Sequence, residues 1–388
     1  MSSRATQIDS LTPLRGIAAI LVILYHMSGI LFLMKLGAMV RGTGFIDRGY
    51  LWVDFFFVLS GFIITHAYGV RLTENWTKQE VRDYLVARFS RLYPLHFVAL
   101  CLSVLLYIGI FSKMPSSGEM SMASIYEWKA LPFHFVWLIG FGLTGMTWNV
   151  PAWSIATEWW TYLLALPLFP HLNRGVSKRT FIVPVLCCTA LFVLISRHPT
   201  RTLNITFDFG LLRCFLSFTV GMCLYQLYKV GFQQRALERD LALVGAGALT
   251  VLLLHFPNPA FTMPTSTAQM PVAHPLTPYF DAVSPLVFGF LILCAAYNRS
   301  GGHRVLNWRP LRYLGDISFS VYLMQVNAFV FFMIVAGGWR QRHPIGEMDA
   351  GTKVLVLSLT VLIDVLIAMA TYRWVERPAR GWLRRKLS

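Results

Sequence analysis

The sequence predicts an all-α protein, built as a polytopic bundle of about ten transmembrane helices. Of its 388 residues 56% are hydrophobic and only 13% are charged, whereas soluble domains carry about 25% charged residues. Ten apolar stretches are long enough, or nearly so, to cross a bilayer as helices, for which about 20 residues suffice. The predicted spans are residues 12–34, 50–69, 94–112, 152–170, 180–196, 209–228, 241–256, 282–297, 314–336 and 354–374.

The distribution of Lys and Arg predicts the orientation of these spans. A further apolar stretch, 131–144, is short and contains His134, so we interpret it as re-entrant or interfacial. Ten spans then leave 23 Lys and Arg on the side of both termini and 10 on the other, with Arg213 inside a span. If 131–144 crossed the membrane, every later segment would change sides, and the counts of Lys and Arg would become 12 on the side of the N-terminus and 21 on the other. The positive-inside rule therefore predicts cytoplasmic termini, and an external loop at 257–281, which lacks Lys and Arg.

The net charge of +16 thus follows from membrane topology and does not indicate a nucleic-acid partner. We expect a single integral membrane domain over residues 1–388, with no separate soluble domain. Residues 1–10 lack a signal-peptide cleavage pattern, so the first span is expected to be retained. All six cysteines fall in apolar segments, which predicts neither a disulfide framework nor a metal site.

The first span carries Arg15 and His26, which are eleven positions apart. Eleven steps make about three helical turns, so both side chains share one face and lie roughly 16 Å apart along the axis. If Arg15 marks one membrane surface, His26 lies near the midplane. An ionisable residue there is costly and usually functional. Histidine is also the side chain best suited to proton transfer near neutral pH.

The second span begins with Asp54 in an apolar helix. A buried carboxylate needs a partner, and an Arg or His on a neighbouring helix is expected. Ser60 and Gly61 give the same helix a polar and thin face that another helix or a ligand can approach. The alternative is a packing motif with a structural ion pair.

Arg88 and Arg91 precede the third span in a segment predicted to be cytoplasmic. They are three residues apart and share a helix face, so they could clamp one polyanion. Paired guanidinium groups suit phosphate oxygens, as a nucleotide-containing acyl donor requires. The alternative is a positive-inside anchor for lipid headgroups.

The fourth span opens with Trp153, and Ser154, Glu158 and Tyr162 follow on one helix face at intervals of four residues. A glutamate among tryptophans inside the bilayer could exchange protons if it is unpaired, or orient a histidine if it is charged. The structural alternative is a buried ion pair between Glu158 and Arg213.

The ninth span carries Ser318, Tyr322 and Gln325 at positions i, i+4 and i+7. This polar stripe on an apolar helix could line a site. Such stripes also serve hydrogen bonding between helices.

Six motifs occur in a characteristic order along the chain. They are Arg15-x10-His26, VDFFFVLSGFIIT (53–65), RFSRLYPLHF (88–97), WSIATEWWTY (153–162), LGDISFSVYL (314–323) and VERP (375–378). Together they resemble the type-3 acyltransferase family, integral membrane O-acyltransferases that modify lipopolysaccharide, exopolysaccharide, peptidoglycan, Nod factors or secondary metabolites. The resemblance runs from about Leu11 to Pro378. Relatives often carry His where this chain has Gln325.

The resemblance implies transfer of an acyl group, most often acetyl, from cytoplasmic acyl-coenzyme A, which is a substrate; no bound cofactor is expected. It makes His26 and Glu158 the expected catalytic residues. The supporting substrate-binding positions that it implies are Arg15, Asp54, Arg88, Arg91, Trp153, Ser154, Ser318 and Tyr322.

We therefore predict an O-acyltransferase of the bacterial inner membrane, whose partners are acyl-coenzyme A, membrane lipids and a glycan or glycolipid acceptor. His26 would act as general base or transient acyl carrier, and Glu158 would orient it or relay the proton. A diffusible metabolite is an alternative acceptor. The alternative functions are a proton-coupled secondary transporter or lipid flippase and a structural subunit. Transporters often contain matched halves, and no such repeat is found.

Overall fold

The all-α prediction is confirmed, because the described residues form helices and turns and contain no β-strand. The last residues of the predicted spans 12–34, 94–112 and 314–336 lie outside the described part of the chain, as do residues 257–273 of the predicted loop. The computed structural model describes residues 8–33, 44–74, 76–109, 126–145, 147–231, 235–256, 274–335 and 349–387.

Several helices are long and apolar enough to cross a bilayer, as expected of an integral membrane protein. Six helices meet this condition by themselves among the described residues. A seventh span results if α14 (Arg309–Asp316) and α15 (Ser318–Val335), which are bent by 69°, cross as one broken helix. The six are Gly49–Glu74, Lys78–Gly109, Lys178–Arg197, Gly210–Val230, Thr277–Tyr297 and Val354–Leu387.

The helices depart from the predicted spans most clearly at two places. Helix α4 (Lys78–Gly109) begins well before the predicted span 94–112, so Arg88 and Arg91 lie within a long helix. The predicted span 152–170 is broken, because α7 (Ala152–Leu164) ends before Pro167. Proline lacks the N–H that would continue the helix, and a 3-10 turn (Leu166–Leu168) and α8 (Phe169–Leu172) follow.

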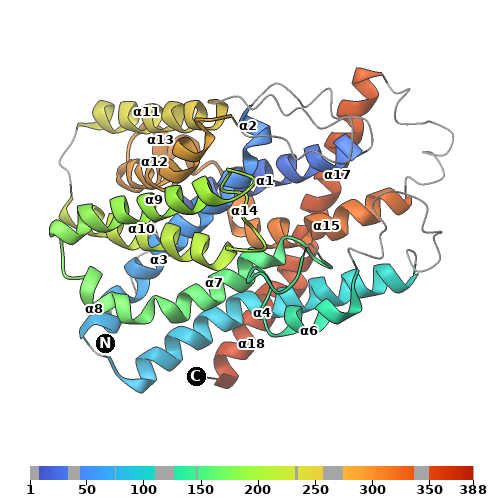
Figure 1. The fold of residues 1–388 in the computed structure, drawn as a ribbon, viewed down its shortest axis with the longest axis horizontal. Coiled ribbons are helices and arrows are strands. Elements are labelled where there is room, and N and C mark those ends of the chain that lie inside the picture. Colours follow the sequence, from blue (N-terminus) through green and yellow to red (C-terminus); the bar gives the residue numbers. More distant parts are fainter. Residues whose placement is uncertain are drawn as a thin grey trace.

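Helices α3 (Trp52–Glu74) and α10 (Gly210–Val230) lie side by side at the centre of one group (Figure 1). A Cβ atom on Gly61 would lie 2.0 Å from the carbonyl oxygen of Phe218, and one on Gly221 would lie 2.0 Å from that of Val58. The two backbones therefore touch, which only glycine permits. Helices α9 (Lys178–Arg197) and α12 (Thr277–Tyr297) flank α10, and α11 (Ala236–His255) packs on α12.

The second group contains α1 (Leu11–Leu33), α14, α15 and α17 (Ala350–Thr371). Here too backbones touch, because a Cβ atom on Gly315 would lie 1.9 Å from the carbonyl oxygen of Thr12. Helix α4 packs against α7, α15 and the C-terminal helix α18 (Arg377–Leu387) (Figure 1). A π-helical turn, Tyr372–Glu376, joins α17 to α18.

The apolar stretch 131–144 forms only a five-residue helix, α6 (Leu131–Phe135), followed by a loop. Five residues cover about 7.5 Å, far less than the hydrocarbon thickness. This agrees with the re-entrant or interfacial interpretation. The loop is fixed by the buried Trp137 and Trp148, and by a 3.0 Å hydrogen bond between His134 Nε2 and Thr147 Oγ1.

The contact between α3 and α10 predicts the effect of Gly61→Ala. The added methyl group would collide with the Phe218 carbonyl and separate the helices, and overpacking of this kind costs about 1–3 kcal/mol. Thermal unfolding in detergent should show a lower melting temperature. Gly245→Ala is the matched control, since a Cβ atom on Gly245 in α11 would have no neighbour within 4 Å. Equal melting temperatures for the two variants would contradict the close approach.

Candidate active site

A buried ion pair joins the start of α3 to α10. Arg213 Nη2 lies 2.6 Å from Asp54 Oδ2, and both side chains are fully buried. Ser217 donates a 3.0 Å hydrogen bond to Asp54 Oδ1, and Arg213 Nη2 also donates to the Tyr50 carbonyl at 2.7 Å. The partner expected for Asp54 is thus an arginine of a neighbouring helix. The guanidinium also stacks over Trp153 at 5.4 Å, which ties α7 to the pair.

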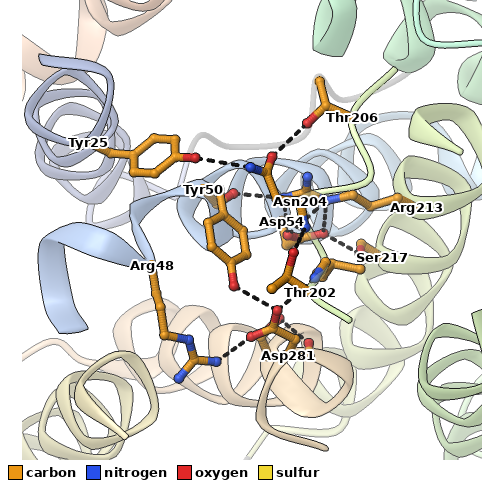
Figure 2. Close-up of polar contacts among 12 residues, drawn as sticks. Tyr25, Arg48, Tyr50, Asp54, Thr202, Asn204, Thr206, Arg213, Ser217 and Asp281 are labelled. Atoms are coloured by element: carbon orange, nitrogen blue, oxygen red, sulfur yellow. Dashed lines mark hydrogen bonds and ion pairs between the residues drawn. The ribbon is translucent and has the colours of Figure 1, made fainter. Parts of the chain in front are cut away.

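A second pair lies beside the first (Figure 2). Arg48 forms a buried ion pair with Asp281 of α12. The same carboxylate accepts hydrogen bonds from the Tyr50 hydroxyl at 2.8 Å and from the Leu203 backbone N–H at 2.7 Å. Sequence analysis did not single out Arg48 or Asp281. Their opposite charges beside the ends of two predicted spans were the available signal.

A central cavity of about 130 Å³ lies where five helices meet. Helix α1 contributes Arg15, and α4 contributes two arginines. The central part of α3 and the polar faces of α7 and α15 complete the wall. The polar lining residues are Arg15, Ser60, Arg88, Arg91, Ser154, Glu158, Tyr162, Ser318 and Tyr322.

Glu158 faces this cavity and is held by two hydroxyl groups. Ser60 of α3 donates a hydrogen bond to Glu158 Oε1, and Tyr162, one turn along α7, donates another at 2.5 Å. The alternative pairing of Glu158 with Arg213 is wrong, because Arg213 pairs with Asp54. Nor does a hydrogen bond or ion pair join Glu158 to His26, whose ring is bonded to Gln325 instead.

The three arginines in the cavity have few counter-charges. Arg15 is half-buried and forms no hydrogen bond or ion pair with any described residue. Arg88 donates only to the neutral Tyr68 hydroxyl, at 3.3 Å, and lies over the Tyr68 ring. Arg91 pairs with Glu376, with Nη1 3.2 Å from Oε1. On the cavity wall itself these three arginines face one carboxylate, that of Glu158.

Glu376 is a site residue that sequence analysis quoted in the VERP motif but gave no role. It lies on the π-helical turn between α17 and α18 and is 2% exposed. Ser320 donates a 2.8 Å hydrogen bond to Oε2, while Oε1 faces Arg91. π-Helical turns often occur at functional sites. Here the turn directs a carboxylate from the end of α17 toward an arginine of α4.

His26 lies outside the cavity lining but is connected to it through Gln325 and Tyr322. Its Nδ1 is 3.0 Å from Gln325 Oε1, and Gln325 Nε2 donates to the Tyr322 carbonyl at 2.7 Å. The Tyr322 hydroxyl in turn lies 2.8 Å from Ser154 Oγ on the cavity wall. Because Gln325 uses its N–H group toward Tyr322, its oxygen must accept from His26. Nδ1 of a neutral ring then carries the proton, and Nε2 has the free lone pair.

Seven of the ten predicted site residues therefore meet around one cavity, and three do not line it. His26 lies one hydrogen-bonded chain away, Asp54 is paired with Arg213, and Trp153 packs behind the wall against Arg213 and Phe57. Within the described residues, no group of three His, Cys, Asp or Glu side chains is arranged to hold a metal ion.

The structure thus combines helices that are long and apolar enough to cross a membrane with a cationic cavity and a nearby histidine, an arrangement compatible with an integral membrane transferase. Residues 8–373 match the family model of the type-3 acyltransferase domain. The chain belongs to this family. The transporter alternative is not favoured.

Two of the relatives share a low sequence identity with the chain, but their matches extend over almost all of it. The chain is 23% identical over 394 residues to the putative peptidoglycan O-acetyltransferase YrhL of Bacillus subtilis, and 23% identical over 395 residues to the O-acetyltransferase OatA of Staphylococcus aureus. Each match covers 96% of this chain but only 55% and 57% of those proteins. Protein 2 in the picA locus of Rhizobium radiobacter is 31% identical over 156 residues, which are 37% of this chain and 77% of that protein. No solved structure matches the chain.

The Asp54–Arg213 pair predicts a double-mutant pattern. Asp54→Leu leaves the Arg213 charge uncompensated inside the bundle, and removing one partner of a buried pair costs about 3–5 kcal/mol. The double variant Asp54→Leu/Arg213→Leu should recover much of the lost thermal stability in detergent. Asp208→Asn is the control, because Asp208 is 60% exposed in its contact with His198. A double variant no more stable than Asp54→Leu would contradict the pairing argument.

Proposed function

We propose that the protein is a membrane O-acyltransferase that moves an acyl group, most often acetyl, from cytoplasmic acyl-coenzyme A to a hydroxyl group of a glycan or glycolipid. The transfer takes place within the bilayer. Family membership supports acyl transfer, and the similarity to YrhL and OatA supports O-acetylation. The glycan acceptor is supported by YrhL, a putative peptidoglycan O-acetyltransferase. Acyl-coenzyme A enters this proposal as a substrate, with no resident cofactor.

The observation that carries the proposal is the excess of arginine in the central cavity. Neither Arg15 nor Arg88 is hydrogen-bonded to a carboxylate of a described residue, and Arg91 shares the Glu376 carboxylate with Ser320. A half-buried guanidinium group is expensive to leave without a counter-charge. Phosphate oxygens satisfy several such groups at once. A phosphate-bearing acyl donor therefore suits this cavity better than an uncharged ligand.

His26 is the proposed base. Its Nε2 has the free lone pair, and it accepts the proton of the acceptor hydroxyl as that oxygen attacks the thioester carbonyl. The carbon–sulfur bond breaks and coenzyme A leaves as a thiolate. In the two-step alternative, Nε2 attacks the carbonyl and carries the acyl group until the hydroxyl takes it. In either case the thioester reaches from the cavity past Tyr322 toward His26.

The sequence left two roles open for Glu158, orientation of His26 and proton relay, and the proposal keeps only the second. The two hydrogen bonds of Glu158 go to Ser60 and Tyr162, and neither goes to His26. We therefore propose that Glu158 relays protons at the donor cavity and that Gln325 orients His26. Ser154, Ser318 and Tyr322 are proposed to line the path of the acyl group.

The proposed membrane arrangement has ten spans, with both termini on the cytoplasmic side of the bacterial inner membrane. One acyltransferase domain extends over residues 1–388. Arg15, Arg88 and Arg91 then lie toward the cytoplasm, where acyl-coenzyme A is made. His26 lies deeper, between donor and acceptor. An acceptor already held at the membrane would gain most from such an enzyme, because tethering reduces the entropy lost in bringing the reactants together.

Arg91→Ala tests the donor site. Losing charge-assisted hydrogen bonds should raise KM for acetyl-coenzyme A about tenfold or more, with a smaller effect on KM for the acceptor. Arg91→Lys should lie between wild type and Arg91→Ala, because it keeps the charge but loses the planar fork. Lys78→Ala, an exposed cation at the start of the same helix, is the control. An equal rise in KM for both substrates would contradict the donor site and favour the interpretation of Arg91 as an anchor for lipid headgroups.

His26→Ala tests the chemical step. Transfer should fall by about 10²–10⁴-fold, the usual contribution of general acid–base catalysis. Expression and melting temperature should stay unchanged. His66→Ala is the control, since His66 is a half-buried histidine whose ring contacts Tyr225. Activity of His26→Ala within about tenfold of wild type would remove His26 from the mechanism.

Alkaline phosphatase fusions test the membrane arrangement. A fusion after Gln269 should be active, and fusions after Arg174 and Ser388 should be inactive. The Arg174 fusion is decisive, because a crossing by 131–144 would place Arg174 outside. An active Arg174 fusion would refute the ten-span arrangement.

A further inference from the structure

The C-terminal helix α18 carries a row of arginines that the proposed function has not used. Arg377, Arg380 and Arg384 follow one another at intervals of three and four residues, so they share one face of the helix. Helix α18 packs along α4 (Figure 1). Its end is fixed there, because Arg82 of α4 donates a 2.9 Å hydrogen bond to the Leu387 carbonyl.

Arg380 is half-buried among like charges. Its guanidinium lies in the neighbourhood of Arg91, Arg88 and Arg384, whose positive charges oppose its own, while Glu376 supplies a negative charge nearby. Glu376 is already engaged by Arg91 and Ser320. Arg380 itself forms no hydrogen bond or ion pair with a described residue. Repulsion within such a cluster is relieved when an anion binds between the guanidinium groups.

The row leads away from the cavity. Glu376 meets Arg91, which lines the cavity wall. Arg380 follows four residues later, about 6 Å further along the helix axis, and Arg384 lies one more turn away. The arginines of α4 and α18 thus form one cationic track, which begins in the cavity and continues along α18.

We propose that Arg380, with Arg384 beside it, binds the ribose 3′-phosphate of acyl-coenzyme A. This inference rests on the proposed function and adds a second phosphate subsite to it. Coenzyme A carries its thioester at one end and its phosphates at the other. When the thioester enters the cavity, the pyrophosphate lies at Arg88 and Arg91. The 3′-phosphate, attached to the ribose beyond the pyrophosphate, reaches the arginines of α18. A lipid headgroup phosphate has the same chemistry, and the test below separates the two sources.

The test measures dissociation constants by titration calorimetry on the full chain in neutral detergent. The probes are acetyl-coenzyme A and acetyl-dephospho-coenzyme A, which lacks only the 3′-phosphate. Arg380→Ala should weaken binding of acetyl-coenzyme A about tenfold, while binding of the dephospho compound should stay within about twofold of wild type. Unchanged binding of the dephospho compound also shows that the variant is folded. Arg385→Ala, which removes the same charge from an exposed position on α18, should alter neither.

Three results would overturn the inference. The first is that Arg380→Ala weakens binding of both compounds equally, and the second is that it weakens binding of neither. The third is a loss seen only when the titration is repeated in nanodiscs that contain anionic lipid, which would assign Arg380 to a lipid headgroup. Failure of the proposed function looks different, because the unaltered protein would then bind neither thioester.

Discussion

The Asp54–Arg213 ion pair is the interaction on which the rest of the site depends. It is fully buried and fixes the start of α3 against α10, while Gly61 and Gly221 let the two backbones touch further along. This register decides where Ser60 lies, and Ser60 holds Glu158. Arg213 also stacks on Trp153 and thereby positions the start of α7, which carries Ser154 and Glu158. One salt bridge thus aligns two of the five helices around the cavity.

The charges of the bundle fall into two kinds. Arg213 and Arg48 each have a carboxylate partner at short range, as a low-dielectric interior requires. Arg15, Arg88, Arg91 and Arg380 are different, because Glu376 is the one carboxylate seen in an ion pair with any of these four within the described residues. Paired charges hold the helices in place. Charges left without partners are what a site for an anionic substrate needs before that substrate arrives.

From the sequence, the helical class and most of the residues that line the central cavity could be predicted, but the hydrogen bonds and ion pairs between them could not. Apolar length and residue spacing are local properties, so α3, α10 and the shared helix face of Arg15 and His26 could be anticipated. The partner of Arg213 could not, because Asp54 and Glu158 are both buried acids and only packing decides between them. Pro167 breaks a stretch whose hydropathy alone predicts a span. Glu376 was hidden because a π-helical turn shifts its direction from that of an ordinary helix.

The central claim is that an acyl group passes from a cytoplasmic donor cavity to His26 and on to an acceptor on the far side. Sidedness of transfer in sealed vesicles tests it most directly. Radiolabelled acetyl-coenzyme A, which does not cross the bilayer, is added to inverted and to right-side-out membrane vesicles. The account predicts labelled membrane glycan only in the inverted vesicles, where the cytoplasmic face meets the donor, and no label with His26→Ala. Equal labelling of intact right-side-out vesicles would contradict it.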